Sequence, residues 1–369
     1  MATSCTSRGS ARITFLLCSL SLFSATFAFG SDYGKVTTQK VADGVYQFSV
    51  SDYGDVGLSG NSVAIIGTEA VLIFDTTGTP ATARAILTEL KKISDRPVRY
   101  VINSHWHWDH WGGNEVFRAA FPDVQIISHQ KTRDMMIHDS IKWNRTYLAT
   151  DIPEHIQQID DAIADSNGSS SAERLARLKN LADADRDFLQ QKRTLTSTFP
   201  NEVFSDSMRI YLGDREVQVF HARAITPGDA FVFLPVEKIL LTGDILVSPI
   251  PFAIGGVYPA TWTEALEKLK RLDPKVIIPG HGPAERDQRF LDENVKLFKR
   301  VRQDVAHAKA SGLSLQQTQK SLENNVAQYA ALLTLDEKSL DSFRALFLNG
   351  FVKNSYLELE HPLSDTPSR

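Results

Sequence analysis

Cysteine is almost absent from this chain. Among its 369 residues there are only two cysteines, Cys5 and Cys18, and both lie close to the N-terminus. A disulfide framework and a cysteine-rich zinc site are therefore excluded from the rest of the chain. A mature protein without cysteine would suit an oxidising compartment.

The chain also lacks a strong excess of either charge. It carries 40 Lys and Arg against 44 Asp and Glu, for a formal net charge of −4, and 42% of its residues are hydrophobic. These proportions are ordinary for a soluble globular protein, and they exclude a disordered chain, a coiled coil and a polytopic membrane protein. The mild acidity argues against nucleic-acid binding, which needs a concentrated basic face.

A long membrane-spanning run is missing as well, although one short apolar segment lies near the N-terminus. Arg8 and Arg12 precede an uncharged run that ends in small residues just before Ser31. This is the layout of a secretory signal peptide, and the run is shorter than the roughly 20 apolar residues that a membrane anchor needs. We expect residues 1–30 to be a signal peptide, the mature protein to be periplasmic or secreted, and no stable membrane insertion after cleavage.

Short β-rich runs and helical periodicities alternate along the remaining chain. Helices are predicted over 81–93 and 263–272, and a polar, mostly helical insertion over about 131–193 with a flexible linker at 167–171. The pattern predicts strands over 45–50, 62–66, 71–74, 98–103, 124–128, 208–212, 216–220, 230–234, 239–241 and 276–278. This order favours an α/β fold of stacked layers, such as two sheets packed face to face with helices outside.

The chain after His281 is predicted to be helical to about Tyr356. Two apolar stripes at helical spacing support this prediction, namely Leu291, Val295, Phe298, Val301 and Val305, and then Leu340, Phe343, Phe347 and Phe351. We expect these stripes to pack on the sheet and not to bind a partner. Residues 31–283 are thus predicted to form one domain, and residues 284–369 a C-terminal helical extension packed on it.

The segment richest in reactive side chains is NSHWHWDHWGGN at 103–114, which follows a predicted strand. In an extended chain, residues two apart point the same way, so His105 and His107 can hold one ion together. The turn that follows directs Asp109 and His110 toward a second point nearby. Imidazole and carboxylate groups at this density suit Zn²⁺ or a similar divalent ion.

Two later strand ends supply matching residues. Asp244 follows the predicted strand 239–241, and His281 lies in a glycine turn after the strand 276–278. Strand ends are where a sheet presents side chains to a common cleft. Each feature alone is weak evidence, but together they predict one metal site assembled from distant segments.

The tryptophans and asparagines of the same segment allow two interpretations. Trp106, Trp108 and Trp111 could line an apolar substrate cleft, or they could pack the metal-binding loop against the helical insertion. We favour packing for at least two of them. Asn103 and Asn114 are expected to hydrogen-bond the loop backbone, as asparagine often does in turns.

Taken together, these motifs resemble the metallo-β-lactamase fold superfamily of metallohydrolases. Its signature is His-x-His-x-Asp-His followed by a distal His, an Asp and a last His, and the resemblance covers roughly residues 45–283. It implies a four-layer αβ/βα sandwich with the metals at one edge of the two sheets. It also implies the ligand sets, which are His105 and His107 for a first metal, Asp109, His110 and His281 for a second, and Asp244 as the bridge.

One position departs from that signature. The family's middle histidine usually stands directly before a Thr-Pro-Gly-Asp-like turn, but here Ile225 precedes the turn at 226–229. His221 could replace the missing ligand only if the loop folded back; otherwise it is a packing or supporting residue. His129 is expected to be a buried histidine at a strand end. We expect one or two Zn²⁺ ions, with the second site tighter than the first.

The resemblance implies a hydrolase that uses a metal-bound hydroxide to cleave an ester, thioester, lactone or amide, a β-lactam included, in a small-molecule substrate. Asp109 would be the catalytic proton acceptor or donor. A non-catalytic or mononuclear metal-binding protein of the same fold is the alternative. A persulfide dioxygenase is disfavoured because such members depend on the histidine that Ile225 replaces. The sequence does not select the substrate or the oligomeric state.

Overall fold

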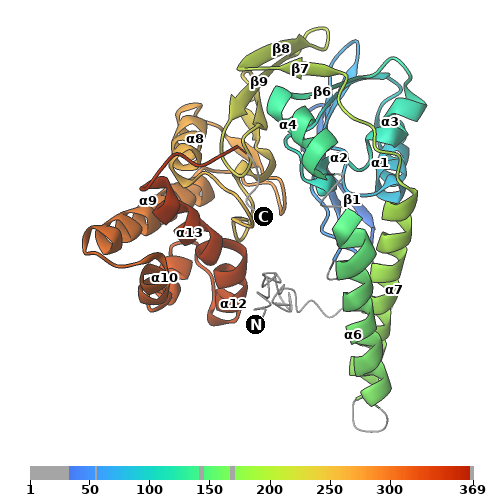
Figure 1. The fold of residues 1–369 in the computed structure, drawn as a ribbon. Helices are drawn as coiled ribbons and strands as arrows, with labels where there is room; N and C mark the ends of the chain where they lie inside the picture. The colour runs from blue at the N-terminus through green and yellow to red at the C-terminus, as the bar shows by residue number, and fades with distance from the viewer. Residues whose placement is uncertain (1–32, 55, 141–144, 167–170, 366–369) are drawn as a thin grey trace, which may run out of the picture.

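The computed structural model describes residues 33–54, 56–140, 145–166 and 171–365, and it consists of two β-sheets with helices around them (Figure 1). The predicted signal peptide lies outside the described residues, so it stays a prediction, and most of the predicted linker at 167–171 lies outside them too. Within the described ranges, no helix is both long enough and apolar enough to cross a membrane.

Among the described residues, the first sheet has seven strands in their order along the chain, β1 to β7. The strands β1 to β4 pair antiparallel, whereas β4, β5, β6 and β7 run parallel. Their bounds are β1 Val36–Ala42, β2 Val45–Val50, β3 Ser62–Ile66, β4 Val71–Phe74, β5 Val98–Ile102, β6 Gln125–His129 and β7 Glu202–Phe204.

The second sheet, in the part of the chain that the structure describes, has five strands in the order β12-β11-β10-β9-β8. All its neighbours pair antiparallel except β11 and β12, which are parallel. Their bounds are β8 Ser207–Tyr211, β9 Glu216–Ala222, β10 Asp229–Leu234, β11 Ile239–Leu241 and β12 Val276–Ile278.

The helices occupy the outer layers, the insertion and the C-terminal part. The α-helices are α1 Pro80–Ile93, α2 Trp108–Trp111, α3 Asn114–Ala120, α4 Gln130–Met135, α6 Ile152–Asp165, α7 Ala172–Thr194, α8 Pro259–Arg271, α9 Arg289–Ala310, α10 Leu315–Glu323, α11 Val326–Ala331, α12 Leu340–Phe343 and α13 Asn349–Glu358. Shorter π-helical and 3₁₀ turns are η1 Met136–Ser140, η2 Tyr147–Asp151, η3 Gly243–Ile245, η4 Glu337–Ser339 and η5 Arg344–Leu348.

The alternation of side chains along β4 explains the layered architecture. Leu72 and Phe74 join a cluster between the two sheets, where they meet residues of the second sheet such as Val232. Val71 and Ile73 point to the other face and pack with the outer helices α1 and α3. Because neighbouring side chains of a strand point to opposite faces, a four-residue apolar strand fills two cores at once. The predicted α/β sandwich is confirmed.

The C-terminal helices cover the outer face of the second sheet. The predicted stripe of α9 is buried along its whole length in one cluster with Phe231 of β10, Ile277 of β12 and Trp262 of α8. Phe347 and Phe351 of the second stripe stack on each other, and both rings pack against Phe298. These stripes therefore pack on the sheet, as predicted.

The segment predicted as a helical insertion folds mainly into α6 and α7. These two helices lie side by side as a long hairpin beside the first sheet (Figure 1). Phe188 of α7 and Ile152 of α6 form a small apolar cluster with Trp108 of the histidine-rich segment. The insertion therefore packs directly on the loop that carries the candidate ligands.

The structure adds two strands that sequence patterning did not predict, β1 and β7. In β1 most side chains are exposed, because it is an edge strand of the first sheet, so its sequence shows little apolar alternation. The strand β7 has three residues, only one of them buried, and pairs with the end of β6 at the other edge. Short edge strands with exposed side chains give almost no hydrophobic signal.

Candidate metal centre

The candidate ligands come from loops that leave the carboxyl ends of parallel strands. The histidine-rich segment follows β5, Asp244 lies one turn after β11, and His281 follows β12. The two sheets approach each other here, since the amide of Ala230 donates to the carbonyl of Ser104 at 2.7 Å. The edge of the sandwich thus brings together residues far apart in the chain.

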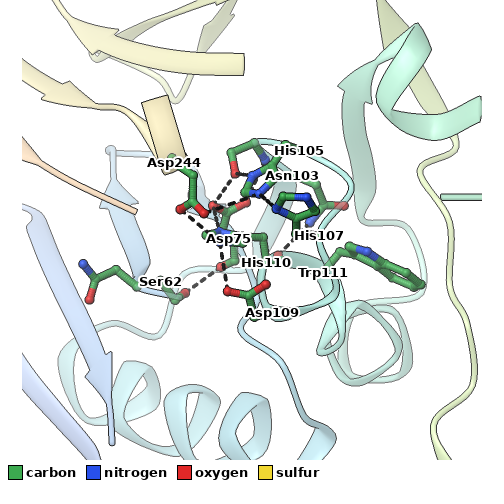
Figure 2. A network of polar contacts seen from close by, with 12 residues as sticks. Ser62, Asp75, Asn103, His105, His107, Asp109, His110, Trp111 and Asp244 are labelled. Atoms are coloured by element: carbon green, nitrogen blue, oxygen red, sulfur yellow. Dashed lines mark hydrogen bonds and ion pairs between the residues drawn. The ribbon is translucent and has the colours of Figure 1, made fainter. Parts of the chain in front are cut away.

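Asp109, His110 and His281 form one group in which a metal ion could be held. Asp109 Oδ2 lies 3.2 Å from His110 Nε2 and 3.1 Å from His281 Nε2. Asp109 and His110 both lie on the short helix α2, which directs the two side chains toward Asp244 (Figure 2). The turn predicted through Trp108 is therefore present.

A second group consists of His105, His110 and Asp244. Asp244 Oδ2 lies 3.6 Å from His105 Nε2, and Asp244 Oδ1 lies 3.2 Å from His110 Nε2 and 3.5 Å from His281 Nε2. Asp244 thus belongs to the second group and also lies close to His281 of the first group. His107 adjoins them through His105, whose Nε2 lies 2.9 Å from His107 Nδ1.

The geometry thus gathers all the predicted ligands in one place, although it divides them differently from the family pattern. His110 belongs to both groups, and His107 belongs to neither. The convergence at one edge of the sandwich is observed. The roles of these side chains as metal ligands, and their division between two ions, stay predictions.

Asp75 was not predicted as a functional residue, yet its carboxylate orients two of the histidines. Oδ2 lies 2.8 Å from His110 Nδ1 and accepts a hydrogen bond from the Ser104 hydroxyl at 2.7 Å, and that hydroxyl lies 2.9 Å from His105 Nδ1. With protons on both Nδ1 atoms, each Nε2 is left as a lone pair for a metal. The sequence feature that could have identified Asp75 is its position as an acidic residue directly after the buried strand β4.

The electrostatics of the cluster favour the ionised forms of Asp109 and Asp244, whose pKa values both lie below their usual range. Burial alone would raise the pKa of Asp109, but the nearby charges of His110 and His281 outweigh it and hold the pKa well below its usual range. Burial likewise would lower the pKa of His110, whereas Asp244, Asp109 and Asp75 raise it well above its usual value. His105 has its pKa lowered, chiefly by burial. Buried, ionised carboxylates this close together are stabilised by positive charge beside them.

Three buried atoms at the centre of the cluster lack a hydrogen-bond partner among the described residues, namely His110 Nε2, Asp244 Oδ1 and His281 Nε2. Buried polar atoms are normally satisfied, so such a group needs an explanation, and an ion is one. Nitrogen and carboxylate oxygen are the donors that Zn²⁺ takes. The residues present therefore fit a divalent metal.

Two glycines allow the loops that follow β11 and β12 to approach each other closely. A Cβ atom on Gly280 would lie 2.0 Å from Asp244 Oδ1, so no side chain fits there. Gly243 adopts a φ of 52°, a conformation that glycine takes at little cost, just before Asp244. These glycines place the Asp244 carboxylate next to the turn that carries His281.

Ile225 is buried in the apolar cluster beneath the second sheet and contributes no ligand atom. His221 does not take its place. Its ring stacks on that of His129, with ring centroids 3.9 Å apart, and its Nε2 lies 3.0 Å from the carbonyl of Pro227. His129 is buried at the end of β6, as predicted. His221 thus supports the turn and lies outside both metal-binding groups.

Trp108 and Trp111 are buried, whereas Trp106 is half-buried. The Trp108 ring packs on Phe188 of the insertion at 4.9 Å, which agrees with the packing interpretation. Asn103 and Asn114 bond chiefly to each other, and each also donates to a loop carbonyl.

A surface cavity of about 560 Å³, lined by residues 91–97, lies at the opposite end of β5 from the cluster and contains none of these side chains. The candidate centre is therefore defined by its side chains and not by the volume of a pocket.

Comparison with known proteins identifies the family. Residues 55–281, which contain every candidate ligand, match the model of the metallo-beta-lactamase superfamily. A linear primary-alkylsulfatase from Pseudomonas sp. (strain ATCC 19151) is 22% identical over 242 residues, which cover 63% of this chain and 43% of that protein. The chain thus matches less than half the length of this relative.

Two solved structures are similar in fold. A stereoselective inverting sec-alkylsulfatase from Pseudomonas sp. has a TM-score of 0.59 and 18% identity, over 88% of this chain and 50% of that one. A metallo-beta-lactamase from Pontibacter korlensis has a TM-score of 0.52 and 17% identity, over 72% of this chain and 99% of that one. At these identities the likeness shows the fold alone. With the family model matched over more than half of its length, the chain belongs to the metallo-beta-lactamase superfamily.

Proposed function

We propose that the protein is a metal-dependent hydrolase that cleaves an ester-type or amide-type bond in a small molecule. The observation that carries the proposal is the convergence of three buried atoms that lack a hydrogen-bond partner among the described residues, namely His110 Nε2, Asp244 Oδ1 and His281 Nε2, which come from separate segments of the chain. The candidate substrates are esters, thioesters, lactones and amides, and the alkylsulfatase relatives add sulfate esters.

The residues of this chain would have distinct roles in hydrolysis. A divalent metal, when bound, would lower the pKa of a water molecule and polarise the scissile group. Asp75 holds His110, and through Ser104 also His105, with each Nε2 directed inward. Asp109, kept ionised by its histidine neighbours, is available to accept the proton of the attacking water.

Two half-buried aromatic rings lie next to two of the candidate ligands. The ring of Phe252 lies 5.2 Å from that of His281, and the ring of Trp106 lies 4.9 Å from that of His107. Apolar surface beside a reactive centre favours a substrate with an apolar portion. An ester that carries an apolar group would meet this preference, but the two rings do not identify a particular ester.

The alternative is a metal-binding protein without turnover, and Ile225 favours it. This side chain stands where the family pattern has a histidine, and it is buried among apolar neighbours. A first metal would then have fewer protein ligands than the second. Loss of that ion would leave a mononuclear centre.

Hydrolysis assays with Asp109→Asn test the proposal. Wild-type protein is stripped with a chelator, reloaded with Zn²⁺ and assayed against a panel of an ester, a thioester, a lactone, a β-lactam and an alkyl sulfate. We expect turnover of at least one substrate, its loss on chelation and its return with Zn²⁺. Asp109→Asn should lower kcat/KM by about 10²- to 10⁴-fold, the usual contribution of a general base.

Asp95→Asn is the matched control, because Asp95 is exposed in the turn before β5, away from the cluster. It should retain full activity. Stoichiometric metal without turnover of any substrate would overturn the proposal in favour of the binding protein.

A further inference from the structure

Lys192 is a buried lysine on α7, the helix of the insertion that packs on the histidine-rich segment. Its residue exposure is only 7%. Its Nζ lies 4.6 Å from the centroid of the Trp108 ring, and among the described residues it has neither a hydrogen-bond nor an ion-pair partner. Lysine is almost never buried to this degree without a partner, so the position needs an explanation.

The surroundings of Lys192 place its charge beside the candidate metal centre. Trp108, over which the ammonium lies, directly precedes Asp109 in the chain, and its ring is held by Phe188, one turn before Lys192. Burial lowers the pKa of Lys192 to about 7, and the Asp109 carboxylate opposes that shift. The ammonium is thus close enough to Asp109 to feel its charge.

Asp109 nevertheless does not form an ion pair with Lys192. Its Oδ2 faces the two histidines His110 and His281, at 3.2 and 3.1 Å. The family chemistry takes the same carboxylate for a metal. A lone ammonium over an aromatic ring, next to the reacting centre, is therefore left for a ligand that carries its own negative charge.

We propose that Lys192 binds an anionic group of the substrate, so that the protein prefers substrates with a carboxylate or sulfate oxygen close to the scissile bond. This inference rests on the proposed hydrolase function and narrows its substrate class. The helical insertion then has a role in specificity, because α7 carries the recognition residue while the sheet edge carries the metal ligands.

A purely structural role for Lys192 makes a different prediction. If the ammonium only packs on Trp108, then Lys192→Met removes a cation–π contact and affects neutral and anionic substrates alike. If it binds substrate, Lys192→Met fills the same space without a charge and affects anionic substrates alone. Methionine is a close match in shape and avoids burying an amine, so this variant should fold.

Paired substrates separate these cases. The zinc-loaded protein is assayed with neutral para-nitrophenyl butyrate, with anionic para-nitrophenyl hemisuccinate and with para-nitrophenyl sulfate. We expect Lys192→Met to raise KM for whichever anionic substrate is turned over by about 10- to 100-fold, as expected for a lost hydrogen bond to a charged group. KM for the neutral ester should change less than about twofold, and Lys192→Arg should restore most of the preference.

Lys268→Met is the matched control. Lys268 is a half-buried lysine on α8, whose Nζ lies 5.2 Å and 5.3 Å from the centroids of the Phe220 and Phe231 rings. Lys268 therefore packs on aromatic rings as Lys192 does, but it lies on the outer face of the second sheet, away from the candidate metal centre. Its substitution should leave the preference for anionic substrates unchanged.

A binding measurement keeps the inference testable without turnover. The thermal midpoint of the metal-free protein is compared in sulfate and in chloride at equal ionic strength. Sulfate should raise the midpoint of wild type and Lys268→Met more than that of Lys192→Met. If no substrate is hydrolysed but this difference is present, the hydrolase proposal fails and anion binding at Lys192 stands. Equal effects of Lys192→Met on neutral and anionic substrates, or no difference in sulfate, would overturn the inference.

Discussion

Asp75 Oδ2 lies 2.8 Å from His110 Nδ1, although the two residues are 35 positions apart. The same carboxylate oxygen accepts the Ser104 hydroxyl, which in turn adjoins His105. One buried aspartate therefore sets the orientation of two candidate ligands from different points of the loop. Such supporting contacts decide how well a metal is held.

Asp75→Asn should weaken metal binding while preserving the shape of the site. An amide has one acceptor oxygen in place of two and cannot favour the proton on His110 Nδ1 as a carboxylate does. We expect the Zn²⁺ affinity, measured by competition with a chromogenic chelator, to fall about 10- to 100-fold. Asp95→Asn serves as the control here too. An unchanged affinity would show that Asp75 has no part in holding the ligands.

Ile225→His should raise the metal content toward two ions per chain. The substitution places an imidazole directly before the turn at 226–229, where the family pattern has its middle histidine. The expected cost is about 1–3 kcal/mol of stability in the metal-free protein, because the site is apolar. Elemental analysis of the variant, wild type and Ile225→Leu provides the comparison. A stoichiometry near two in all three proteins would contradict the idea that Ile225 weakens a site.

Gly280→Ala should abolish tight metal binding, since the new methyl group would lie 2.0 Å from Asp244 Oδ1 and must displace that carboxylate. Gly312→Ala is a suitable comparison. Gly312 has a positive φ, of 82°, so alanine is strained there, but an added Cβ atom would meet no atom of the described residues within 4 Å other than its chain neighbours. Zinc titration should therefore show a loss only for Gly280→Ala. Equal metal binding by the two variants would mean that Asp244 can move aside without consequence.

The stacked pair of His129 and His221 should make the protein sensitive to acid. Burial, then the neighbouring charge of His221, lowers the pKa of His129 from 6.5 to about 4, and Lys131 adds to the shift while the Ser205 backbone and Asp206 oppose it. The folded state therefore prefers neutral His129. The unfolded state binds the proton first, so stability falls as the pH drops from about 6.5 toward 4.

His129→Asn should reduce this loss. Asparagine retains the ability of His129 to accept a hydrogen bond from the Lys131 amide at the start of α4, but it does not titrate. Urea denaturation in chelator at pH 7 and pH 5 should show a smaller pH-dependent loss for the variant than for wild type. His307→Asn, on the exposed side of α9, is the control. Identical losses in wild type and His129→Asn would refute the assignment.

Sequence patterning predicted the strands and helices well where side chains are buried on a regular period, whereas the two-sheet sandwich was implied by the family resemblance. The strand β4 and the stripes of α9 are clear examples, because each residue that packs in a core must be apolar at a fixed spacing. The edge strands β1 and β7 escaped prediction because their side chains are mostly exposed. A regular apolar spacing arises only where side chains are buried, and an edge strand has few buried side chains.

The candidate ligands of the centre could be predicted from the sequence itself. His105, His107, Asp109 and His110 are close together in the chain, and imidazole and carboxylate groups at such spacing have few other uses. Tertiary structure alone decided that Asp75 supports two of these histidines, that His221 packs on His129, and that Lys192 reaches the neighbourhood of Asp109. Contacts between distant positions depend on strand order and helix packing, which no local pattern of residues encodes.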